Sequence, residues 1–259
     1  MRHVAGNGVS KLTNAMTNDK KDTIFSRPLG EIAGFSFDES VAAVFPDMIQ
    51  RSVPGYNTVI AISGVLAEQF SQQGSRIYDL GCSLGATTLA MAQGLPQDHC
   101  EIIAVDNSRA MLDRARQVID QQALPVPVQL RCEDLCAIEI STASVVALNF
   151  TLQFVDVAQR LALLKRIHAG MHPGGVLILS EKIRFADAAL NTLFIDLYHD
   201  FKRTQGYSDL EISQKRTALE NVLIPETLED HRARLNEAGF TRVAVWFQCF
   251  NFASLVAFK

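Results

Sequence analysis

Short apolar runs that alternate with helical patterns are the feature that most constrains the fold of this chain. The runs are 76–80, 100–106, 126–132, 144–149 and 176–180. Helical patterns occupy about 86–93, 108–121 and 157–171. Strands that are apolar on both faces and joined by helices indicate a parallel sheet covered on both sides. Two final strands, 241–247 and 251–258, are expected to form an antiparallel hairpin.

Helical segments are also expected before and after this core, at about 36–71 and 185–222. In the first segment, Ser36 with Glu39 three residues on has the spacing of a capping box. Pro46 predicts a break or kink in that helix. We expect both segments to act as lids. Residues 22–259 are expected to form one domain, preceded by a polar, disordered extension at 1–21.

Composition narrows the possible partners. Of 259 residues, 48% are hydrophobic, enough for a buried core. Lysine and arginine total 24 against 28 acidic residues, a balance that argues against direct nucleic-acid binding. No apolar run approaches the roughly 20 residues of a membrane helix. The absence of a secretory leader and the odd count of five cysteines predict a reduced, cytoplasmic protein.

A metal site is not expected. Cys132 and Cys136 are four residues apart, which is compatible with metal ligation, but no second His or Cys pair stands nearby. Two semi-buried cysteines flanking a turn are the favoured interpretation.

The most informative motif is D-x-G-x-x-x-G at 79–85, between a strand and a helix. Glycines allow a sharp turn and close approach of a ligand, although a turn whose glycines serve packing alone has the same pattern. The spacing differs from the dinucleotide fingerprint. Asp106, Asp134 and Asn149 stand at or just after the next strands. Each alone is compatible with a helix cap, but together they converge on one rim of the sheet, where open α/β sheets bind ligands.

This arrangement resembles class I S-adenosylmethionine-dependent methyltransferases, which have a Rossmann-like, seven-stranded sheet with a C-terminal antiparallel hairpin. The chain after about residue 22 more specifically resembles the bacterial carboxy-S-adenosyl-L-methionine synthases. The runs that carry this resemblance are FPDMIQRSVPGY at 45–56, YDLGCSLG at 78–85, LNFTLQF at 148–154, LEISQKR at 210–216 and WFQCFNF at 246–252.

The resemblance implies an enzyme that adds a carboxylate to the sulfonium methyl of S-adenosyl-L-methionine, a substrate, using prephenate and releasing phenylpyruvate. In the implied route the methyl group is deprotonated to an ylide that captures carbon dioxide. The product then serves a separate tRNA carboxymethyltransferase that modifies a wobble uridine. The resemblance also implies a homodimer.

Site residues follow from the same resemblance. Tyr56 contacts the ligand, Arg216 pairs with the transferred carboxylate, and Asn149 lies at the methionine end. The loop residues are Gly81, Cys82 and Ser83, the ribose side is Asp106 and Asn107, and the adenine side is Asp134 and Leu135.

The residues around Arg216, taken alone, favour a solvated helix face, since acidic Asp209 and Glu211 precede it. The chemistry favours arginine as a carboxylate partner, because a guanidinium binds bidentately and stays charged. Further candidates for binding a dianionic substrate are Lys202, Arg203, His199 and Tyr198. Two alternatives remain open: an ordinary small-molecule methyltransferase on the same fold, and a non-catalytic S-adenosylmethionine-binding regulator.

Overall fold

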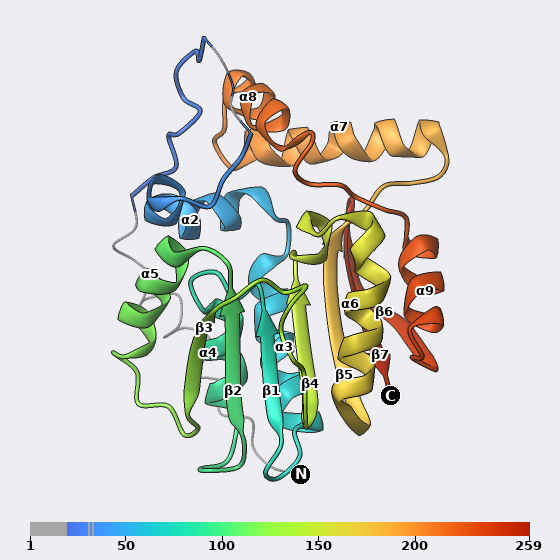
Figure 1. The fold of residues 1–259 in the computed structure, drawn as a ribbon. Coiled ribbons are helices and arrows are strands. Elements are labelled where there is room, and N and C mark those ends of the chain that lie inside the picture. The colour runs from blue at the N-terminus through green and yellow to red at the C-terminus, as the bar shows by residue number, and fades with distance from the viewer. Residues whose placement is uncertain (1–19, 31, 33) are drawn as a thin grey trace, which may run out of the picture.

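The computed structural model describes residues 20–30, 32 and 34–259, and its centre is a seven-stranded sheet (Figure 1). The strand order is β3-β2-β1-β4-β5-β7-β6, with β7 antiparallel to both of its neighbours and the other pairs parallel. The strands are β1 (Arg76–Leu80), β2 (Glu101–Asp106), β3 (Val128–Cys132), β4 (Ala143–Asn149), β5 (Met171–Lys182), β6 (Arg242–Cys249) and β7 (Phe252–Phe258). The expected doubly covered, mostly parallel sheet with a terminal hairpin is confirmed.

Helices cover both faces of the sheet because successive strand residues point to opposite sides. Tyr78 and Leu80 pack toward α6 (Val157–Gly170) and α9 (Leu228–Glu237). Ile77 lies on the other face, in a cluster that takes in α3 (Tyr56–Phe70) and α4 (Ala86–Gln93). Helix α5 (Arg109–Ile119) completes this second layer through its contacts with β2 and β3.

Three further helices lie above the carboxyl ends of the parallel strands (Figure 1). They are α2 (Glu39–Ser52), α7 (Ala188–Thr204) and α8 (Asp209–Leu219). Hydrogen bonds join the N-terminal segment to α8. The Gln214 amide donates to the carbonyls of Phe25 and Arg27 and accepts from the N–H of Leu29. Within the segment 36–71, only α2 and the residues flanking it lie above the strands, because α3 packs against the sheet.

The expected N-cap of α2 was wrong, and so was the expectation of a break within the helix. Asp38, and not Ser36, is the N-cap, since its carboxylate accepts the Val41 N–H at 3.0 Å. The helix does not break at Pro46, a buried residue inside one continuous helix. A proline removes one backbone hydrogen bond, and burial of the apolar face of α2 offsets that loss.

Strand β5 starts earlier than the sequence indicates. The pairing with β4 passes from Met171 directly to Val176, so the intervening His-Pro-Gly-Gly residues leave the ladder as an irregularity within the strand. At its other end β5 reaches Lys182, two residues beyond the apolar run. Most of the expected extension at 1–21 lies outside the described residues. No helix among the described residues is both long and apolar enough to cross a membrane.

Candidate functional site

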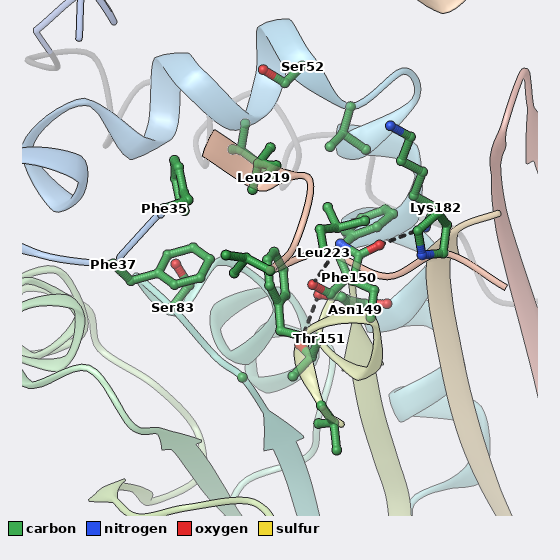
Figure 2. A pocket seen from close by; sticks show the side chains of 18 of the residues that line it. Phe35, Phe37, Ser52, Ser83, Asn149, Phe150, Thr151, Lys182, Leu219 and Leu223 are labelled. Carbon is green, nitrogen blue, oxygen red and sulfur yellow. Dashed lines mark hydrogen bonds between the residues drawn. The ribbon is translucent and has the colours of Figure 1, made fainter. Parts of the chain in front are cut away.

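A cavity of about 700 Å³ lies at the carboxyl ends of the strands, below α2, α7 and α8. Figure 2 shows Phe35 and Phe37 at one end of it and Lys182 at the other, with Asn149 and Phe150 between them. The cavity therefore spans the switch point of the sheet, where β1 has β2 on one side and β4 on the other.

The glycine motif forms a tight turn from β1 into α4. Gly81 and Gly85 have φ of +80° and +84°, in the left-handed region that favours glycine. A side-chain carbon on Gly81 would collide with Thr151. Between the two glycines, Cys82 and Ser83 line the cavity.

The ends of β2 and β3 supply a second wall. Both carboxylate oxygens of Asp106 accept backbone N–H groups, and burial raises its pKa above the usual range. Asn107 is exposed beside it. Beyond β3, Asp134 accepts the Cys136 N–H at 2.8 Å, which holds the loop that carries buried Leu135.

Asn149 is fixed at the centre of the site. Its amide donates to the hydroxyls of Ser63 and Thr87, at 3.1 and 3.2 Å, and its oxygen accepts from Ser180 at 2.7 Å. The next residue, Phe150, has φ of +61° and faces Tyr56 across 6.3 Å between ring centroids. Burial raises the pKa of Tyr56, so its hydroxyl stays neutral.

The far end of the cavity is cationic. Its basic residues are Lys182, His199, Lys202, Lys215 and Arg216. Burial and the neighbouring Arg216 guanidinium lower the pKa of Lys182 to about 8. Burial also lowers the pKa of Lys215 to about 8, although nearby Asp22 opposes that shift. Arg216 itself is exposed, in the last turn of α8.

All ten residues named from the sequence line this one cavity: Tyr56, Gly81, Cys82, Ser83, Asp106, Asn107, Asp134, Leu135, Asn149 and Arg216. Sequence reasoning missed Lys182 and Lys215. Lys182 had a usable signal, because it ends a parallel strand as Asp106 and Asn149 do. Lys215 had none, since a lysine in an exposed-looking helix gives no sign of burial.

Comparison with known proteins identifies the family. A family model described as a methyltransferase domain matches residues 77–175. The carboxy-S-adenosyl-L-methionine synthase of Geobacter sp. (strain M21) is 61% identical over 241 residues, 93% of this chain and 99% of that protein. The chain belongs to the carboxy-S-adenosyl-L-methionine synthases. The synthase of Salmonella agona is 54% identical over 239 residues, 92% of this chain and 97% of that one.

Solved structures show how widely this synthase family shares its fold. An O-methyltransferase family protein from Burkholderia thailandensis aligns with a TM-score of 0.61 at 15% identity, covering 85% of this chain and 59% of that one. A cyclopropane synthase from Mycobacterium tuberculosis gives 0.53 at 17% identity, covering 72% and 62%. Among the described residues of this synthase, no group of three or more His, Cys, Asp or Glu side chains could hold a metal.

Proposed function

We propose that the protein converts S-adenosyl-L-methionine and prephenate into carboxy-S-adenosyl-L-methionine, phenylpyruvate and water. Prephenate loses its ring carboxylate as carbon dioxide and its ring hydroxyl as hydroxide. The hydroxide takes a proton from the sulfonium methyl, and the resulting carbon nucleophile bonds to the carbon dioxide. The atoms and charges of this reaction balance without any other reactant, and the reaction needs no separate general base.

The observation that carries this proposal is the cationic end of the cavity. A sulfonium is itself positive, so several cations beside it are unfavourable for plain methyl transfer to a neutral acceptor. They suit a reaction in which a dianion lies between them and the sulfonium. The family membership and the cations therefore favour carboxyl transfer over the ordinary methyltransferase alternative.

We propose roles for the remaining cavity residues from the family resemblance, and their place in one cavity supports these roles. Asp106 and Asn107 lie where they can accept or donate to ribose hydroxyls, and Asp134 and Leu135 where they can frame adenine. In this proposal Asn149 and Tyr56 bind the methionine end, and the loop residues Gly81, Cys82 and Ser83 contact the ligand through their backbone. The helices α2, α7 and α8 would act as lids that keep water from the reacting carbon.

Two wider assignments belong to the same proposal. The product would be used in the cytoplasm by a tRNA carboxymethyltransferase, while this acidic protein does not itself bind nucleic acid. A homodimer is supported by an exposed apolar stripe on α7, where Leu190, Leu193 and Leu197 lie at helical spacing. Light scattering of the wild type and of a Leu193→Glu variant tests the dimer, which the charge should dissociate.

The experiment that tests the activity is mass spectrometry of the ligand that co-purifies with the protein, followed by incubation with both substrates. A ligand heavier than S-adenosyl-L-methionine by one carbon dioxide is expected, and its amount should rise with added prephenate. Recovery of only S-adenosyl-L-methionine or S-adenosyl-L-homocysteine, with no carboxylated product on incubation, would contradict the proposal. A bound ligand without any turnover would favour the regulator.

A further inference from the structure

Two lysines at the cationic end share one aromatic ring. The ammonium nitrogens of Lys182 and Lys202 each lie 4.9 Å from the ring centroid of Tyr198. Lys182 ends β5, whereas Lys202 and Tyr198 belong to α7. The ring thus joins a strand end of the core to a helix above it, and all three residues line the cavity.

Among the residues that the structure describes, no carboxylate lies at ion-pair distance from either ammonium group, although Asp22 acts on Lys202 from farther away. Neither lysine forms an ion pair there, although Lys202 is only 5% exposed. Nearby Lys215 differs, because its ammonium lies 3.7 Å from the carboxylate of Asp22 and donates to Ser52 at 3.0 Å. A tyrosine face compensates a buried ammonium only in part. Burial, Lys215 and Lys182 lower the pKa of Lys202, and a carboxylate bound beside the two lysines would favour their charged forms.

We propose that Lys182 and Lys202 form a second carboxylate subsite, separate from Arg216, that binds the side-chain 2-oxo acid carboxylate of prephenate. This inference rests on the proposed function. Prephenate carries two carboxylates with different fates: the ring carboxylate is transferred, and the 2-oxo acid carboxylate remains in phenylpyruvate. A site that handles both must hold the second while the first leaves.

In this proposal Arg216 and the lysine pair bind different carboxylates of prephenate. Arg216 faces a carboxylate that ends in carboxy-S-adenosyl-L-methionine, so it should matter for that product. The lysine pair faces a carboxylate that ends in phenylpyruvate, so it should matter for prephenate and phenylpyruvate alike. The pair would also exclude compounds that have the ring carboxylate alone.

The test uses the variants Lys182→Met and Lys202→Met, which remove the charge and keep an apolar stem. We expect the KM for prephenate and the inhibition constant of phenylpyruvate to rise by about 10- to 100-fold, the loss of one charge-assisted contact. The dissociation constants of S-adenosyl-L-methionine and of carboxy-S-adenosyl-L-methionine should change less than about threefold. Arg203→Met is the matched control. Arg203 was also a candidate from the sequence, but it does not line the cavity: it is exposed on the same helix and pairs with Asp200 and Asp209.

Three outcomes would overturn the inference. If the inhibition constant of phenylpyruvate is unchanged in both variants, the two lysines do not bind its carboxylate. If the binding of all ligands weakens equally and the melting temperature falls, the lysines serve folding and not the subsite. In that case Lys202→Arg should not restore selective inhibition by phenylpyruvate. If the wild type makes no carboxylated product from prephenate, the result contradicts the proposed function and therefore also the lysine subsite. An active wild type with insensitive lysine variants overturns only the subsite.

Discussion

Asp106 accepts a hydrogen bond from the backbone N–H of Ser83 at 2.9 Å. This bond joins the end of β2 to the loop after β1, the two segments expected to hold the nucleoside. The other carboxylate oxygen accepts the N–H of Ser108 at 2.8 Å, at the start of α5. Asp106 therefore shapes the glycine loop and also remains at the cavity wall with lone pairs for a ligand.

Replacing Asp106 by alanine should weaken S-adenosyl-L-methionine binding by about 1.5–3 kcal/mol, the scale of hydrogen bonds to a charged group. The loss combines missing ribose contacts with a loosened Ser83 loop. Titration calorimetry measures it, with Asp113→Ala on the exposed face of α5 as the control. Unchanged affinity in Asp106→Ala would remove this carboxylate from the site.

Gly81→Ala should lose most ligand binding. The left-handed backbone alone costs an alanine about 1–2 kcal/mol, and its side chain would also collide with Thr151. Gly74→Ala is a matched control, because Gly74 has a similar φ of +72° with open space around it. Thermal unfolding and ligand titration of both variants separate strain from collision. Equal behaviour of the two would show that the loop adapts and that Thr151 does not restrict it.

Sequence patterns predicted the sheet and the glycine loop because apolar strands and turn residues depend on local rules. The convergence of Asp106 and Asn149 on one rim followed from the geometry of parallel strands. The features that the sequence did not predict include contacts between segments that are far apart in the chain. Buried Lys215 pairs with Asp22, almost 200 residues earlier, and helical periodicity does not report that contact. The Asp38 cap was missed because Ser36 offered an equally good capping pattern.

Acid should destabilise the protein through His231. This side chain is 2% exposed, and neither ring nitrogen has a hydrogen-bond partner in the described structure. Burial lowers its pKa from 6.5 to about 4. The unfolded chain therefore binds the proton more readily, so stability contributed above pH 6.5 is lost as the pH falls toward 4.

At pH 5 this loss amounts to about 2 kcal/mol, from 1.36 kcal/mol per pKa unit. Urea unfolding of the wild type and of His231→Leu at pH 7.5 and 5.0 measures it. The variant should lose less stability between the two conditions than the wild type. The same decrease in both proteins would mean that other groups cause the acid sensitivity.

Phenylpyruvate should form only when S-adenosyl-L-methionine is bound. In the proposed reaction the hydroxide and carbon dioxide from prephenate are consumed by the sulfonium methyl, so decarboxylation and carboxylation form one event. Absorbance of phenylpyruvate is followed with prephenate alone and with both substrates. Enzyme-dependent phenylpyruvate formation without S-adenosyl-L-methionine, above the spontaneous rate, would uncouple the two halves and contradict this mechanism.

Arg216 should discriminate between the product and S-adenosyl-L-methionine, which differ by one carboxylate near the sulfonium. In Arg216→Ala that carboxylate lacks its partner, and carboxy-S-adenosyl-L-methionine should bind about 2–3 kcal/mol more weakly. This is the lower part of the range for a broken charge pair, because Arg216 is exposed. S-adenosyl-L-methionine should bind equally well or better, since a repulsion between guanidinium and sulfonium is removed. Arg216→Lys should recover only part of the loss, because a point charge cannot bind the carboxylate bidentately.

Two dissociation constants for each variant measure this discrimination, with Arg232→Ala on the exposed surface of α9 as the control. The pair Lys182 and Lys202 provides an internal contrast, since its variants should leave the binding of both of these ligands nearly unchanged. Equal losses for the two ligands in Arg216→Ala would make Arg216 a structural residue of a solvated helix face. The carboxylate partner would then have to be sought among the other basic residues of the cavity.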